Sequence, residues 1–208
     1  MKIMQTMGKQ ELMRQLSQID RQNGMLPPDL MPKTRDASVK LWGCLPMPYY
    51  NSLRPKSLDD VFRSPTCSMA VVKKEFGEQH LRALTVHILN DLINFFNVGK
   101  TMGAIQVAQT ADLIIEEDYY LKPDDFKLCF NRAKKGYYGK LYDRIDGQVI
   151  LDWLSKYDAE RTELARVDSE QNAVYWDLEG TERTSERKSS EYQAYLKSYY
   201  QGKFNSKQ

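Results

Sequence analysis

Hydrophobic positions recur at helical spacing through the middle of the chain, with polar positions between them. The richest segment runs from Glu78 to Val98 and carries two apolar stripes side by side. One stripe contains Leu81, Leu84, Ile88, Leu92 and Phe95, and the other contains Val86, Leu89, Ile93 and Phe96. A helix that is apolar on most sides is buried on most sides, so this segment is predicted to be the central helix, bounded by Gly77 and Gly99.

Four further helices are predicted around it. One spans residues 68–76 with Ser68 as its cap, and another spans residues 101–120 with Thr101 as its cap. A third starts at Pro123, where proline is tolerated in the first helical turn, and ends before Gly136 and Gly139. The fourth starts after Asp146 and carries a stripe near helical spacing from Val149 to Ala165.

The two ends of the chain have a different character. Residues 8–22 predict a short helix, and the segment from Pro27 to Pro65 holds seven of the eight prolines, so we expect it to be extended and irregular apart from one turn capped by Ser57. Residues 185–204 predict a final helix. The expected fold is therefore all-α: a compact bundle of about five helices with an extended Pro-rich N-terminal arm and a C-terminal helix. Its expected parts are residues 1–63, 64–172 and 173–208.

Composition and charge exclude several classes. The chain has 208 residues and a formal net charge of +2, with basic ends flanking a mildly acidic middle. The three cysteines are far apart, which is typical of reduced thiols in a cytosolic protein. The first ten residues lack the apolar core of a signal peptide, and no apolar run approaches the roughly 20 residues that cross a bilayer. We expect a cytoplasmic protein without a membrane partner.

No catalytic, cofactor or metal motif stands out. Residues 98–101 resemble the end of a phosphate-binding loop, but the earlier glycine and the preceding strand are missing. Acidic residues gather between Glu116 and Asp125, yet consecutive carboxylates on a helix point in different directions, which favours a solvated acidic face over a metal site. The sequence thus predicts a protein that is not an enzyme and has no cofactor, with a metal-dependent enzyme at the acidic segment as a less favoured alternative.

The stronger signal is a basic and aromatic segment around the two turn glycines. Lysine and arginine bind phosphates, and exposed tyrosines stack on bases, so this segment is a candidate nucleic-acid site. Its residues are Lys127, Arg132, Lys134, Lys135, Tyr137, Tyr138, Lys140 and Arg144. The alternative is that the lysines compensate a helix dipole and the tyrosines pack in the core.

Aromatic residues near both ends are candidates for docking on a protein partner or on a second copy of the chain. A plain disordered linker has few aromatics. The candidates are Trp42, Tyr49 and Tyr50 in the Pro-rich arm and Tyr192, Tyr195 and Tyr199 in the predicted last helix.

Several short motifs resemble a family of small helical proteins of uncharacterised activity carried by bacterial prophages and conjugative elements. They are SPT at 64–66, KKEFGE at 73–78, NFFNV at 94–98, QTA at 109–111 and KKGYYG at 134–139. Thr110–Ile114 and Asp125–Phe126 are also faintly similar to the N-terminal domains of phage replicative-helicase loaders and inhibitors. The resemblance implies an accessory protein of a mobile element, in DNA replication or maintenance, that acts through a protein partner and nucleic-acid contacts. A protein-interaction or structural module without nucleic-acid binding is the alternative.

Overall fold

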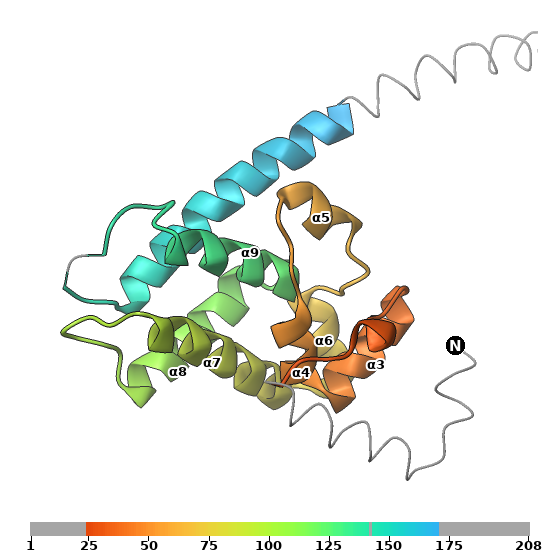
Figure 1. Ribbon diagram of the computed structural model, residues 1–208, viewed down its shortest axis with the longest axis horizontal. Helices are drawn as coiled ribbons and strands as arrows, with labels where there is room; N and C mark the ends of the chain where they lie inside the picture. Colours follow the sequence, from red (N-terminus) through yellow and green to blue (C-terminus); the bar gives the residue numbers. More distant parts are fainter. Residues whose placement is uncertain (1–23, 142, 171–208) are drawn as a thin grey trace, which may run out of the picture. The chain divides into compact units, whose positions relative to one another are not determined.

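The computed structural model describes residues 24–141 and 143–170, and these residues form an all-α fold (Figure 1). Extended pairing within them is limited to one isolated parallel bridge between Lys100 and Arg144. The chain divides into two compact units, Met1–Ala159 and Glu160–Gln208. The features below belong to the first unit unless stated otherwise.

The helices follow one another with short connections. A 3-10 turn, η1 (Pro28–Leu30), precedes α3 (Arg35–Cys44), α4 (Pro46–Ser52), α5 (Leu58–Arg63), α6 (Met69–Phe76), α7 (Glu78–Phe95), α8 (Ala104–Glu117) and α9 (Pro123–Lys134). Residues 147–170 form a further helix, of which residues 160–170 belong to the second unit. Among the described residues, no helix has both the length and the apolar composition needed to span a bilayer.

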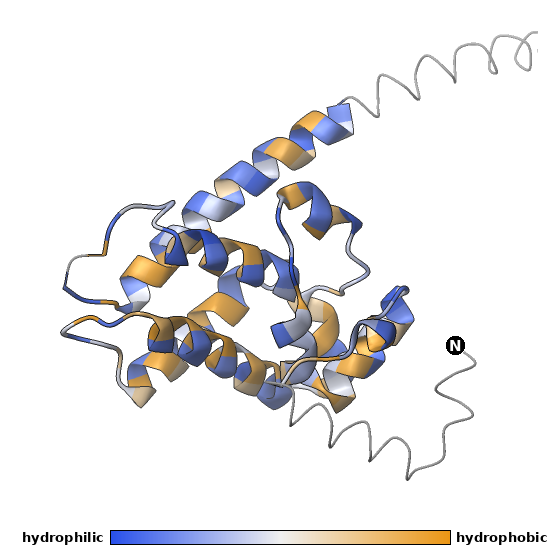
Figure 2. Cartoon of the chain, in the orientation of Figure 1, coloured by the Kyte–Doolittle hydropathy of each residue, from blue (hydrophilic) through white to orange (hydrophobic). Residues whose placement is uncertain are grey.

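Helix α7 is the central helix, as its two apolar stripes predict. Leu81, Ile88 and Leu92 are at most 1% exposed, and α7 packs against α6 and α8 (Figure 1). Hydrophobic and hydrophilic residues alternate around the helices (Figure 2), which is the pattern of elements that are buried on one side. Phe95 departs from the prediction: the last residue of α7 is 56% exposed.

The Pro-rich segment is not an extended arm. Helices α3, α4 and α5 occupy most of it, and its residues pack with those of α6, α7 and α9. Proline is compatible with α4 because Pro46 is in the first turn, where its missing N–H costs no hydrogen bond. The predicted extended backbone was wrong because it weighed proline content without the position of each proline within a turn.

The aromatic residues of this segment are core residues, which corrects their assignment as partner contacts. Trp42, Tyr49 and Tyr50 are at most 1% exposed. The rings of Trp42 and Tyr49 lie 4.5 Å apart between centroids, and the Tyr49 hydroxyl donates to Ser38 Oγ at 3.1 Å. These side chains cannot reach a partner from the folded state.

Two of the four predicted caps are confirmed. Ser57 Oγ accepts the N–H of Asp60 at 3.2 Å at the start of α5, and Asp146 Oδ1 accepts the N–H of Val149 at 3.1 Å. Ser68 makes no side-chain cap. Instead, the carbonyls of Leu121 and Tyr119 accept the first two N–H groups of α6, at 2.9 and 2.8 Å. Helix α8 starts at Ala104 rather than at Thr101, and Gln106 Oε1 accepts the N–H of Gly103.

Several predictions concern residues outside the described ranges. They are the helix at 8–22, the linker and helix at 173–208, and the aromatic residues Tyr192, Tyr195 and Tyr199.

Candidate nucleic-acid interface

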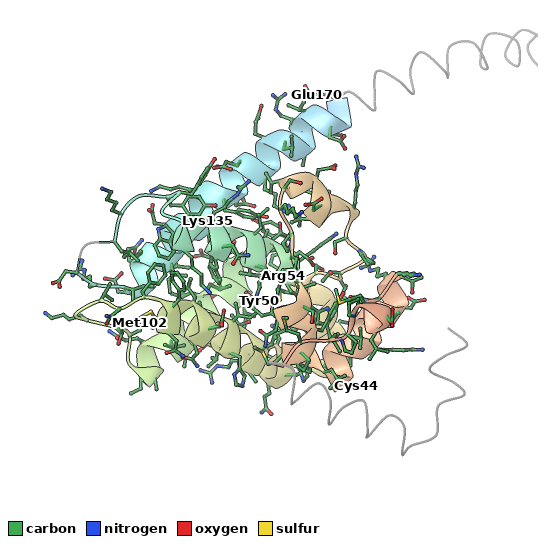
Figure 3. The ribbon with its side chains drawn as sticks, viewed as in Figure 1. Cys44, Tyr50, Arg54, Met102, Lys135 and Glu170 are labelled. Atoms are coloured by element: carbon green, nitrogen blue, oxygen red, sulfur yellow. The ribbon has the colours of Figure 1, made fainter. Side chains whose placement is uncertain are left out.

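A turn containing two glycines follows α9 and forms the centre of the candidate interface. Gly136 has φ +78° and Gly139 has φ +114°, backbone angles that side chains rarely allow. A Cβ atom at Gly139 would meet nothing within 4 Å, so the glycine is required by the backbone angle and not by crowding. The turn therefore presents open backbone, as the two glycines predict. Figure 3 marks Lys135 at the end of α9 where this turn begins.

The two tyrosines of the turn have different environments. Tyr137 is 61% exposed, whereas Tyr138 is half-buried and packs against the core. Their rings meet edge to face, with centroids 5.2 Å apart, and burial raises the pKa of the Tyr138 phenol. The exposed ring of Tyr137 is thus available for stacking on a base, and the half-buried ring of Tyr138 supports it through their edge-to-face contact.

Two shallow clefts border the turn. The larger has a volume of about 520 Å³ and is lined by Lys140, Arg144 and Trp153 among others. The smaller, of about 350 Å³, is lined by Lys134, Phe96 and again Lys140. Gly139, Lys140 and Leu141 line both clefts. Lys140 therefore lines two concave surfaces that each carry another basic side chain, and the larger one is also lined by Asp143 and Asp152.

The bridge between Lys100 and Arg144 adds a basic residue that is distant in sequence. The Lys100 N–H donates to the Asp143 carbonyl at 3.2 Å, and the Ile145 N–H donates to the Lys100 carbonyl at 3.1 Å. Both basic residues are exposed, although Arg144 Nε also pairs with Asp146 Oδ2 at 3.2 Å. Lys100 thus extends the basic surface beside the turn.

Two of the predicted nucleic-acid-binding residues, Lys127 and Lys134, contact other parts of the fold instead of lying on the turn. Lys127 Nζ lies 4.4 Å from the centroid of the buried Tyr50 ring, and desolvation lowers the pKa of this lysine to about 8. Lys134 Nζ is 3.2 Å from Asp91 Oδ2 and 5.1 Å from the Phe95 ring centroid. The Lys127 side chain packs against the Tyr50 ring. The Lys134 ammonium is paired with the Asp91 carboxylate of α7, although Lys134 also lines the smaller cleft.

Arg132 is part of an aromatic stack. Its guanidinium carbon lies 5.2 Å from the ring centroid of Tyr137 and 5.8 Å from that of Tyr157. Such cation–π contacts contribute about 0.5–2 kcal/mol each, depending on exposure. The guanidinium of Arg132 therefore supports the ring of Tyr137. We assign Arg132 as a supporting residue rather than as a phosphate ligand.

The structure brings together Lys135, Tyr137, Lys140 and Arg144 at one turn, and adds two residues that the sequence did not assign. One is Lys100, which the bridge to Arg144 places there. The other is Phe95, whose ring meets Phe96 edge to face and lies under Lys134. Adjacent Phe95 and Phe96 cannot both point inward from one helix, a signal for Phe95 that was present in the sequence.

The carboxylates of the acidic segment lie in two different environments. Glu116 and Glu117 are exposed on α8, while Asp124 and Asp125 are buried at the start of α9. Among the described residues, no three histidine, cysteine, aspartate or glutamate side chains converge as metal ligands would.

Comparisons of the chain with protein-family models, with curated proteins and with solved structures returned no match. Any functional assignment rests on the geometry of the turn and its surroundings.

Proposed function

We propose that this protein binds single-stranded nucleic acid through the glycine turn and its basic surroundings, as an accessory protein without catalytic activity. The single observation that carries the proposal is that one turn holds both the exposed Tyr137 ring and Lys140, a residue that lines two clefts. An exposed aromatic ring on a surface that also carries exposed basic side chains is the combination used to stack bases and hold phosphates without reading sequence.

Single strands fit this surface better than a duplex. Stacking on Tyr137 requires an unpaired base whose face is accessible. The exposed basic side chains come from the turn and from the segment around Lys100, which the bridge to Arg144 places beside it. In this proposal they contact the phosphates of a single nucleic-acid strand that runs along the turn.

The cellular setting is proposed from the sequence motifs at 64–78, 94–98, 109–111 and 134–139. These motifs favour an accessory role in the replication or maintenance of a mobile element. In that role, single-stranded DNA is the expected nucleic acid, and a protein partner is expected to act beside it.

A pair of charge reversals tests the proposal. Lys135→Glu with Lys140→Glu changes two exposed side chains and leaves the internal contacts of Lys127 and Lys134 intact. Fluorescence anisotropy with a labelled oligonucleotide should show at least about a tenfold weaker complex. The matched control is Lys73→Glu with Lys74→Glu, the same change of charge on exposed positions of α6. Equal affinity of the two double variants would refute the proposal.

A protein-interaction module is the second candidate. It is favoured by two exposed apolar residues on α8, Ile105 at 76% and Leu113 at 44%. Ile105→Ser with Leu113→Ser should abolish self-association or partner association, measured by analytical ultracentrifugation and by pull-down, and under this second function the unaltered protein should not bind the oligonucleotide. Unchanged association would reject this second function.

A further inference from the structure

Lys127 is a half-buried lysine of α9 that the candidate interface does not use. Its ammonium nitrogen lies 4.4 Å from the ring centroid of Tyr50, a residue of α4 that is 1% exposed and is labelled in Figure 3. Within residues 24–141 and 143–170, the ring is the contact of this nitrogen, and no carboxylate or carbonyl accepts a hydrogen bond from it. The ammonium has therefore lost water without gaining an acceptor.

The charged groups around Lys127 do not compensate for this loss. Asp91 of α7 attracts the ammonium, but Asp91 Oδ2 is 3.2 Å from Lys134 Nζ and is shared with that lysine. Arg54 and Lys134 both repel Lys127. The Arg54 guanidinium stays in place because its Nη1 donates to the carbonyls of Asn51 and Leu53. One shared carboxylate thus stands against three cations.

This environment favours the neutral amine. Desolvation lowers the pKa of Lys127 to about 8, Asp91 opposes the decrease, and Arg54 and Lys134 add to it. At pH 7.5 about a quarter of the side chain is then neutral, compared with about 0.1% for a lysine of ordinary pKa. A neutral amine carries a lone pair that an ammonium lacks, so it is the nucleophilic form.

The nitrogen of Lys127 remains in contact with solvent. Four polar side-chain atoms of the described residues are both buried and without a hydrogen-bond partner, and they belong to Trp42, Asp124, Tyr138 and Asp158. Lys127 Nζ has no hydrogen-bond partner in that part of the chain and is not one of these atoms. A small molecule in solution can therefore reach it.

We infer that Lys127 is a modification site, an amine nucleophile that takes an acyl group from small acyl phosphates. The cations around it specify the class of donor, because Arg54 and Lys134 attract the phosphate of an anionic reagent. Acylation also removes one of three mutually repelling charges, so the product is favoured by the same surroundings.

The reaction is a transfer of an acyl group without a change of oxidation state. The lone pair of Nζ attacks the carbonyl carbon of the acyl phosphate, and an N–C bond forms. The bond from that carbon to the phosphate oxygen breaks, and inorganic phosphate leaves with its electron pair. The nitrogen releases one proton to water and becomes a neutral amide.

Acetylation of the folded, full-length protein by acetyl phosphate at pH 7.5 tests this inference. Proteolysis and mass spectrometry give the initial rate at each lysine. Lys127 should react at least about tenfold faster than the exposed Lys74 and Lys135, because its larger neutral fraction outweighs its partial shielding. Its rate should level off above about pH 8, whereas the rates at Lys74 and Lys135 should still rise at pH 9.

Asp91→Asn removes the carboxylate that attracts the ammonium, so acetylation of Lys127 at pH 7 should become about twofold faster or more. The matched control is Asp112→Asn, which removes an exposed acid of α8 that is paired with Arg82. It should leave the rate at Lys127 unchanged. Three outcomes would overturn the inference: equal rates at Lys127, Lys74 and Lys135, parallel pH profiles at the three lysines, or no acceleration by Asp91→Asn.

Discussion

The Tyr157 hydroxyl donates a 2.7 Å hydrogen bond to Oδ1 of Asp125, and both side chains are fully buried. The other oxygen of Asp125 accepts the Lys122 N–H at 2.7 Å and so caps the first turn of α9. One carboxylate thus fixes the start of α9 and joins it to the helix that begins at residue 147. These two helices flank the glycine turn, so their fixed geometry supports the candidate interface.

Removing this bond should destabilise the protein. Tyr157→Phe leaves Asp125 Oδ1 without the phenol donor, and we expect the free energy of unfolding to fall by about 1–3 kcal/mol. Urea denaturation followed by circular dichroism measures it. The control is Tyr119→Phe, at a position that is 54% exposed, which should change stability by less than about 0.5 kcal/mol. Similar values for both variants would contradict the structural role of this bond.

The positive φ angle at Gly139 predicts a backbone effect. Gly139→Ala forces a residue with a Cβ atom to φ +114°, and we expect a loss of at least about 1 kcal/mol of stability. Gly103→Ala is the control, because its φ is −75° and its new Cβ would meet nothing within 4 Å. Urea midpoints compare the two variants. A more stable Gly139→Ala would show that the turn has a different conformation.

Asp118 predicts a pH dependence of stability. Burial, together with repulsion from Asp158 and Glu117, raises the pKa of this carboxyl to about 6. The unfolded value is near 4, so the folded state binds the proton more tightly. The stability contributed by this group is complete below about pH 4 and is lost as pH rises through about 6.

Urea midpoints measured across this pH window test that dependence. The urea midpoint of Asp118→Asn should decrease less steeply with rising pH than that of the unaltered protein. Asp112→Asn is the control, since Arg82 lowers the pKa of that exposed carboxyl, and it should not remove the decrease. Parallel curves for the unaltered protein and Asp118→Asn would contradict the predicted titration.

Tyr137 and Tyr138 should have separable roles. Tyr137→Ala removes an exposed ring, and we expect affinity for single-stranded DNA to fall by about 1–3 kcal/mol with little change in stability. Tyr138→Ala removes a half-buried ring and should chiefly lower the unfolding free energy. Anisotropy and urea denaturation on both variants measure the two quantities. The stacking role of Tyr137 is rejected if its removal leaves affinity unchanged.

Much of the helical framework could be predicted because the signals are local. The stripes of α7, the proline at the start of α9, the glycines after it, and the caps at Ser57 and Asp146 all act within one or two turns. The start of α8 and the cap of α6 were missed. The donors at the start of α6 are satisfied by carbonyls some 50 residues away in sequence, so no local pattern encodes that contact.

The candidate site could be predicted only in part, for a similar reason. Lys127 and Lys134 are seven residues apart in α9, so they lie on nearly the same face. The contacts of Lys134 with Asp91 and of Lys127 with Tyr50 depend on tertiary packing and are invisible in the sequence. Lys135 is one residue further along, about 100° around the helix, and is exposed. A basic segment therefore divides into internal and external residues according to helical phase.

The most direct test of the proposed function is the affinity of the unaltered protein for a short single-stranded oligonucleotide at two salt concentrations. Lys100, Lys135, Lys140 and Arg144 are the exposed basic residues around the turn. If they engage about three phosphates, the logarithm of the association constant should fall with the logarithm of salt concentration with a slope of about −2. A matched duplex should bind more weakly. Absence of binding at low salt, or binding that is indifferent to salt, would contradict a nucleic-acid interface at the glycine turn.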